Sequence, residues 1–207
     1  MSSNPKWLEW AQKLQALSQT GLAFSTNPFD LQRYTEIQHI AAEILSSYTQ
    51  EDLATVQGIF QNQAGYATPK VDSRGVIFQN GQILLVKELS DSGWTLPGGW
   101  VDVNESPSVA VEREVREEAG YVVKARKLLA LYDRNKHGHP PYPFHAYKLF
   151  FLCELLEKTE ADPTETADAS FYSEDSIPPL SLMRVTNEEI SRMFEHYRHP
   201  DWPTDFD

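Results

Sequence analysis

The sequence predicts an α+β protein, in which a small helical domain (residues 1–66) precedes a mixed domain of strands and helices (residues 67–207). Up to about residue 64, apolar residues recur with helical spacing. From residue 71 onward the apolar runs suit strands, and Asn80-Gly81 between two of them is typical of a type I′ hairpin turn. One short helix is expected among the strands, over residues 106–119.

Three helices are expected in the first domain. Two begin at the Asn-Pro pairs at residues 4–5 and 27–28, and the third covers residues 51–61. Two apolar stripes follow helical spacing, and they consist of Trp7, Trp10, Ala11, Leu14 and Leu17, then Tyr34, Ile37, Ala41, Ile44, Leu45 and Tyr48. Helices this short need a partner surface. Either they pack on the rest of their own chain or, as we prefer, they form the interface of a homodimer.

The mixed domain follows a linker at residues 64–69. Strands are expected at residues 71–78, 82–86, 121–132 and 145–155, with a short one at residues 171–172. A final helix over residues 186–197 precedes a polar tail.

Composition limits the classes of function. The 207 residues carry a net charge of −12, which argues against broad affinity for nucleic acid or anionic membranes. The single cysteine, Cys153, excludes a disulfide within the chain. No apolar run is long enough to span a membrane, and no secretion signal is evident, so we expect a cytoplasmic protein.

The short helix carries a cluster of acids. Ser106 and Pro107 suit its start and Gly120 its end. Glu114, Glu117 and Glu118 are spaced so that their carboxylates share one face. Two carboxylates about 4 Å apart repel by roughly 4 kcal/mol at an effective dielectric near 20. The cluster is therefore either a solvated acidic face or a site for Mg²⁺ or Mn²⁺, which prefer oxygen ligands.

The surrounding spacing favours the second interpretation. Five residues separate Gly99 from Glu105, and seven more precede the run Arg113-Glu-Val-Arg-Glu-Glu-Ala-Gly-Tyr121. This pattern resembles the Nudix box of the Nudix hydrolases. The resemblance implies an α/β/α sandwich with a mixed sheet, and metal-dependent hydrolysis of a nucleoside diphosphate linked to another moiety.

The resemblance also implies roles for individual residues. Glu114, Glu117 and Glu118 correspond to the metal ligands, and one of them is also a candidate general base. The Gly99 carbonyl corresponds to an added ligand. Glu105 and Arg113 correspond to an ion pair that ties the loop to the helix.

Outside the box, the loop at residues 132–145 is rich in histidine and proline. We expect a substrate-facing lid in which Arg134, Lys136 and His137 donate to phosphate, although a rigid proline loop is the plainer alternative. Tyr142 and Phe144 are expected to stack on a base or to pack in the core. A zinc site is disfavoured because no cysteine accompanies the histidines.

One further metal-binding acid is expected outside the box, as in other Nudix enzymes. Asp168 is the first candidate and Glu165 the second, and a solvated loop is the alternative for each. The N-terminal helices, residues 134–137 and residues 177–181 resemble a narrower Nudix branch that acts on nucleoside diphosphates linked to X. That branch implies CDP-choline as substrate, split into CMP and phosphocholine. ADP-ribose, RNA processing and non-catalytic nucleotide sensing are the alternatives.

Overall fold

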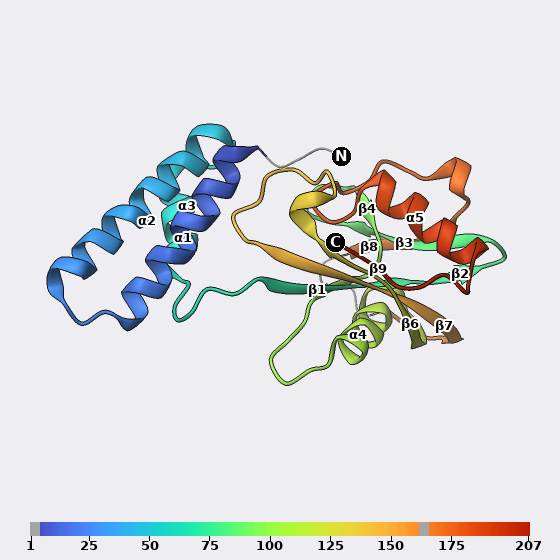
Figure 1. Cartoon of the computed structure of the whole chain (residues 1–207). Coiled ribbons are helices and arrows are strands. Elements are labelled where there is room, and N and C mark those ends of the chain that lie inside the picture. Colours follow the sequence, from blue (N-terminus) through green and yellow to red (C-terminus); the bar gives the residue numbers. More distant parts are fainter. Residues whose placement is uncertain (1–4, 162–165) are drawn as a thin grey trace. The chain divides into compact units, whose positions relative to one another are not determined.

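The computed structural model describes residues 5–161 and 166–207 (Figure 1). The chain divides into two compact units, and each is described by itself. One unit holds the N-terminal helices up to residue 69 together with residues 141–145, and the other holds residues 70–140 and 146–207. Within the described residues, we find no helix with the length and apolar character that a membrane crossing needs.

The helical unit contains α1 (Lys6–Phe24), α2 (Pro28–Tyr48) and α3 (Leu53–Gln61). At the start of α2 the Asn27 side chain accepts a hydrogen bond from the Phe29 N–H, and Asp52 caps α3 in the same way. Pro5 is the cap residue of α1, whereas Asn4 lies outside the described residues. The three predicted helices are therefore confirmed, with small shifts at their ends.

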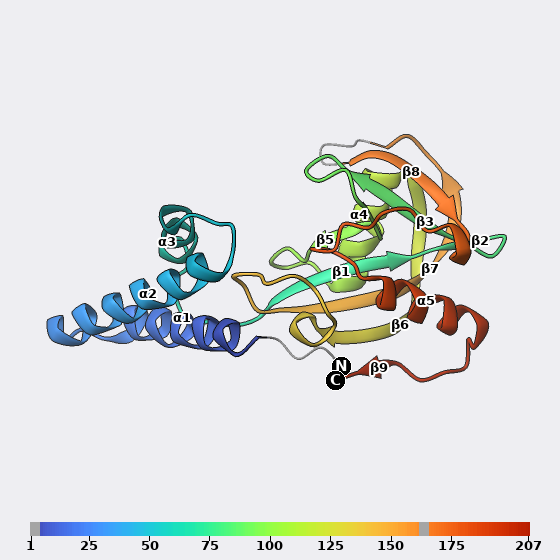
Figure 2. The same cartoon turned by 90° about the horizontal axis from the view of Figure 1, so that it is seen from above.

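The helices enclose a small core, which contains Leu8, Ala41, Ala42, Leu45, Val56 and Phe60. Helices α1 and α2 lie side by side (Figure 2). Gly21 permits this approach, because a Cβ there would lie 2.4 Å from the ring of Tyr34. The predicted stripe on α1 is divided in the single chain: Ala11 is buried, whereas Trp10 and Leu17 are 59% and 55% exposed.

The second unit contains two sheets. The five-stranded sheet has the order β5 (Gly98–Trp100), β1 (Lys70–Val76), β7 (Ala146–Lys158), β6 (Tyr121–Asp133) and β9 (Asp205–Phe206). Strand β1 is antiparallel to β5 and parallel to β7, so the sheet is mixed, as predicted. The four-stranded sheet combines β2 (Phe78–Gln79), β3 (Gln82–Glu88), β4 (Trp94–Thr95) and β8 (Thr166–Tyr172). Asn80 and Gly81 have φ values of 52° and 76°, which confirms the type I′ turn between β2 and β3.

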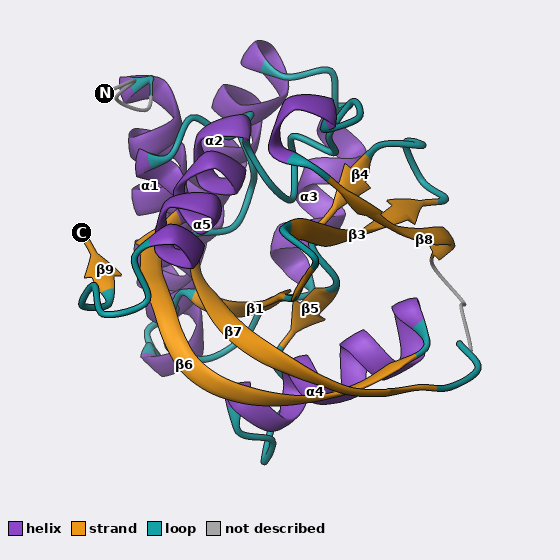
Figure 3. Ribbon diagram, turned by 90° about the vertical axis from the view of Figure 1, so that its right-hand side faces the viewer, coloured by secondary structure: helices purple, strands orange, loops and turns teal. Residues whose placement is uncertain are grey.

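Helices cover the two faces of this unit. Helix α4 (Pro107–Ala119) packs through Val111 and Val115 on a cluster from β3, β6 and β7, while α5 (Asn187–Arg198) packs through Ile190 and Met193 on the other cluster. Two short 3₁₀ turns complete the elements, η1 (Arg134–Lys136) and η2 (Glu174–Ser176). Figure 3 shows the long strands β6 and β7 curving together past α4. The predicted α/β/α arrangement is confirmed.

The C-terminal segment differs from the predicted polar tail. Strand β9 pairs with β6 in parallel, and Asp205 lies beside three donors from the rest of the unit. Its carboxylate accepts from the Tyr132 hydroxyl at 3.0 Å, from Arg192 NH2 at 3.0 Å and contacts His196 Nε2 at 3.1 Å. The pKa of Asp205 is lowered to about 2, mainly by the hydrogen bonds from Arg192. Burial acts in the opposite direction and is the weaker effect.

We expect Asp205→Asn to destabilise the protein by about 1–2 kcal/mol at pH 6, because charge-assisted hydrogen bonds are lost. The pKa of Asp205 is about 2 in the folded protein and lies below the ordinary value of 3.8, so its contribution to stability is complete above about pH 4 and is lost as the pH falls towards 2. The difference in unfolding free energy between the wild type and this variant should therefore fall to about half at pH 3. Urea unfolding at both pH values measures it, with exposed Asp201→Asn as control. A difference independent of pH would contradict the assignment.

Candidate active site

The acidic helix α4 is fixed at both ends and along its buried face. Pro107 is its first residue, and Gly120 closes it in the left-handed conformation, with φ at 68°. A side chain at Gly120 would meet the Thr159 carbonyl oxygen at 2.8 Å, so glycine is required there. Val111 and Val115 are fully buried. This packing sets the rotation of the helix and hence the direction of its three adjacent carboxylates.

Two of these carboxylates lie against β5. The Gly98 N–H donates to Glu118 Oε2 at 2.8 Å, and a Cβ on Gly99 would lie 3.2 Å from Glu114 Oε1. Burial and the neighbouring carboxylates Glu114 and Glu88 raise the pKa of Glu118 to about 8, although Arg74 and the Gly98 N–H oppose this rise. Burial also raises the pKa of Glu114. Partly buried carboxylates with raised pKa values form a region that a cation would stabilise.

Arg113 supplies a positive charge to this acidic region. Its guanidinium donates through Nε and NH2 to Glu105 at 3.1 and 3.0 Å, which gives the ion pair between the loop and the helix. Its NH1 atom donates to both Glu114 and Glu117, each at 3.0 Å. Arg113 therefore compensates three carboxylates at once, and the strength of these contacts raises its pKa.

The described residues contain no group of three His, Cys, Asp or Glu side chains that is already arranged to hold a metal ion. The cause is visible in the geometry, because Arg113 bonds Glu114 and Glu117 while Glu118 turns to Gly98. The donors nevertheless fit a hard cation, since all of them are oxygens. If Arg113 released Glu114 and Glu117, three carboxylates would be available on one helix face beside Gly99. The described structure does not show this arrangement, and the assignment of these residues as metal ligands therefore stays a prediction.

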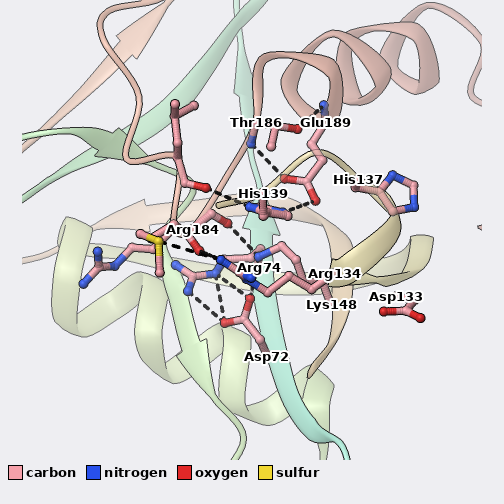
Figure 4. A network of polar contacts seen from close by, with 12 residues as sticks. Asp72, Arg74, Asp133, Arg134, His137, His139, Lys148, Arg184, Thr186 and Glu189 are labelled. Carbon is pink, nitrogen blue, oxygen red and sulfur yellow. Dashed lines mark hydrogen bonds and ion pairs between the residues drawn. The ribbon is translucent and has the colours of Figure 1, made fainter. Parts of the chain in front are cut away.

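Strands β1 and β7 carry a buried network of charged side chains that was not predicted from the sequence (Figure 4). Arg74 donates through Nε and NH2 to Asp72, and its NH1 holds the Leu96 carbonyl oxygen at 3.2 Å. Lys148, only 1% exposed, donates to Asp72 at 2.7 Å and to the Arg184 carbonyl oxygen at 2.6 Å. The network therefore fixes the segment that leads into Gly98 and Gly99. Charged residues at inward positions of predicted strands were the available signal.

The same network reaches the start of α5. His139 contacts the Leu182 carbonyl oxygen at 2.8 Å and Glu189 Oε1 at 3.0 Å. Glu189 also accepts from the Thr186 N–H and thereby completes a capping box with Thr186. These contacts attach the loop after β6 to the C-terminal helix (Figure 4).

The structure places the predicted lid residues in different environments. Arg134 is not the exposed phosphate donor that we expected: it is 5% exposed and donates to the carbonyl oxygens of Pro140 and Met183, because these carbonyls lie within the fold and need donors. His137 stacks on Tyr132 with ring centroids 3.8 Å apart and contacts Asp207. Lys136 is exposed.

The remaining candidates are two aromatic residues and two acids from outside the box. Tyr142 and Phe144 belong to the helical unit, where their rings meet edge to face and Gln12 donates to the Tyr142 carbonyl oxygen. Asp168 is exposed on β8, and its carboxylate accepts from the Ala169 N–H. Glu165 lies outside the described residues. Within the part of the chain that the structure describes, no hydrogen bond or ion pair joins Asp168 to the three box carboxylates, so its part as a ligand also stays a prediction.

Comparison with known proteins agrees with this architecture. Residues 69–194 match the NUDIX domain, and residues 5–60 match the family described as a UDP-X-like, N-terminal oligomerisation domain. The chain therefore belongs to the Nudix hydrolases and is a pyrophosphohydrolase of that family. Nudix hydrolases generally use divalent metal ions.

Two types of relative stand out. The chain is 43% identical to a putative ADP-ribose pyrophosphatase of Bacillus subtilis, over 98% of this chain and 97% of the relative. A solved ADP-ribose pyrophosphatase from Streptococcus suis is 42% identical with a TM-score of 0.62, and the match covers 68% of this chain and all of that one. A solved UDP-X diphosphatase is 30% identical with a TM-score of 0.64, and the match covers both chains completely.

We expect Glu118→Gln to abolish most activity and yet to stabilise the metal-free protein. Because the pKa of Glu118 is raised to about 8, its ionisation destabilises the fold increasingly between about pH 4.5 and 8 and fully above pH 8. If removal of this charge raises the free energy of unfolding by about 1 kcal/mol, the Tm should rise by about 2–4 °C for a chain of this size. Thermal unfolding with excess chelator at pH 5 and pH 8.5 measures it, and the gain should be larger at pH 8.5.

The matched control is Glu112→Gln on the same helix, where the side chain accepts from the Ala125 N–H and does not face β5. This variant should retain activity. Full activity of Glu118→Gln, or a loss of stability at pH 8.5, would contradict the proposed environment of Glu118.

Proposed function

We propose that the protein hydrolyses the diphosphate bond of a nucleoside diphosphate linked to a second group, with Mg²⁺ or Mn²⁺ as cofactor and ADP-ribose as the first candidate substrate. The observation that supports this substrate is the 43% identity to a putative ADP-ribose pyrophosphatase, which extends through both units of the chain. The site supports the reaction class, because α4 carries three carboxylates beside Gly98 and Gly99 of β5, and such a cluster suits a diphosphate that is bound through a cation.

The residues divide the work as follows. Glu114, Glu117 and Glu118, with the Gly99 carbonyl, would hold the cation, which supplies neutralisation of the phosphate oxygens and activation of water. No covalent nucleophile is needed, because the leaving group is already a phosphate. A carboxylate within hydrogen-bond reach of the attacking water takes its proton, and any of the three glutamates can serve. Arg113 keeps Glu105 and its loop attached to the helix.

CDP-choline is the second candidate, favoured by the resemblance to the narrower branch and by one structural observation. Trp100 follows Gly99 in β5 and is 43% exposed, so it offers an accessible aromatic face, on the side of the strand opposite to the Gly99 Cβ position. A quaternary ammonium on such a face gains about 0.5–2 kcal/mol. A UDP-linked substrate, as the name of the solved UDP-X diphosphatase indicates for that protein, belongs to the same reaction class.

Hydrolysis is expected to stop with excess chelator and to return with excess Mg²⁺ or Mn²⁺. With the metal fixed, kcat/KM for ADP-ribose should exceed that for CDP-choline by about tenfold or more, and ADP-ribose should give AMP and ribose 5-phosphate. Product identification by chromatography separates this cleavage from others. A reversed preference would replace ADP-ribose by CDP-choline, whereas no hydrolysis of any nucleoside diphosphate derivative would contradict the reaction class.

We also propose that the helical unit forms a homodimer. Its three-helix core is small, and α1 exposes Trp10, Leu17 and Phe24 at intervals of seven residues, which places them on one side of the helix. They are 59%, 55% and 69% exposed. The match of residues 5–60 to an oligomerisation domain supports this assignment.

We expect Leu17→Asp to convert the dimer into a monomer at micromolar concentration, because a charge would be buried in an apolar interface. The matched control is Leu156→Asp on β7, which alters a leucine of similar exposure, 54%, in the other unit. Light scattering of the wild type and both variants measures the assembly. A monomeric wild type, or dissociation by the control alone, would contradict the proposed interface.

A further inference from the structure

Ser73 lies in the middle of β1 and is fully buried. Its hydroxyl has no hydrogen-bond partner among the described residues. A buried polar group without a partner costs about 1–3 kcal/mol, so such groups are rare in native proteins and often indicate a functional contact.

The direction of Ser73 follows from the alternation of side chains along β1. Asp72 and Arg74 point to the face that carries the buried charged network. Gly75 is on the opposite face, where a Cβ would lie 2.7 Å from Val115 Cγ2 and 3.3 Å from Val111 Cγ2. Ser73 shares this face with Gly75 and therefore points towards α4.

The position of Ser73 along β1 brings it beside the acidic cluster. It pairs directly with Gly99 in β5. Paired residues of antiparallel strands carry their Cβ atoms on the same face, about 4.5–5.5 Å apart. The Cβ position of Gly99 is itself 3.2 Å from Glu114 Oε1. The unpartnered hydroxyl thus neighbours the carboxylate that Arg113 holds at 3.0 Å.

We propose that Ser73 is a positioning residue of the cation site, whose hydroxyl donates a hydrogen bond to Glu114 once a cation has drawn this carboxylate away from Arg113. The inference rests on the proposed function, because it presumes that Glu114 is a cation ligand. Groups that orient metal ligands in this way typically change metal affinity by about 10–100-fold. Thr95 also has a buried hydroxyl without a partner among the described residues, but its strand β4 pairs with β3 and not with β5, so we assign it no part in the cation site.

The experiment compares the full-length wild type with Ser73→Ala after removal of metal. Calorimetric titration with Mn²⁺ should give a Kd about tenfold weaker for the variant. The Tm in excess chelator should stay unchanged or rise, since the hydroxyl has no partner to lose. The control is Cys153→Ala, which also trims a buried side chain of the cluster that packs on α4. It should lower the Tm without changing the Kd for Mn²⁺.

Equal Mn²⁺ affinity of the wild type and Ser73→Ala would overturn the inference and leave the proposed function intact. A clear fall in the metal-free Tm of Ser73→Ala would also overturn it, because it would show that the hydroxyl stabilises the fold without a cation. Absence of Mn²⁺ binding by the wild type would contradict the proposed function itself. These outcomes separate the two hypotheses.

Discussion

The close approach of α4 to β1 and β5 is the constraint on which the site depends. Gly75 and Gly99 make it possible, because a Cβ at either would be obstructed by α4, and Gly98 lets β5 approach β1 in the same way. At Gly75 a Cβ would meet Val115 at 2.7 Å, at Gly98 it would meet the Ser73 carbonyl oxygen at 2.1 Å, and at Gly99 it would meet Glu114 at 3.2 Å. With no side chains between helix and strands, backbone groups of β5 come within hydrogen-bond distance of glutamates on α4. The same proximity removes water from these carboxylates and raises the pKa of Glu118.

The opposite face of β1 shows how the protein supports this strand. Asp72, Arg74 and Lys148 are all nearly inaccessible to solvent, and the Asp72 carboxylate pairs with both cations, at 2.8 Å and 2.7 Å. Burying three charges is costly, and their mutual attraction offsets that cost only when the hydrogen bonds are well formed. A well-formed network has a single geometry, so Arg74 fixes the Leu96 carbonyl and, with it, the path of the chain into Gly98 and Gly99. We therefore regard the buried charges as a means of fixing the site, and not as a net source of stability.

Much of the box was predictable because its signals are local. Pro107, Gly120 and the valine spacing define the helix within a single stretch of sequence, and Asn80-Gly81 defines its hairpin. The features that escaped prediction depend on contacts distant in sequence. The sequence alone predicts Arg134 as a solvent-facing donor, whereas in the fold it donates to the carbonyl oxygen of Met183, 49 residues further on. The polar tail becomes β9 only because Asp205 meets donors from β6 and α5.

Arg113 stabilises a helix face that carries several carboxylates. Its contacts with Glu105, Glu114 and Glu117 replace part of the attraction that a divalent ion would provide. If a cation binds Glu114 and Glu117 as we propose, it must compete with the arginine for them, which would lower the affinity that the carboxylates alone would give. Glu105 has no such competition, since it bonds Arg113 through two other donors. Under that proposal the arginine could release both glutamates and still hold the loop against the helix through Glu105.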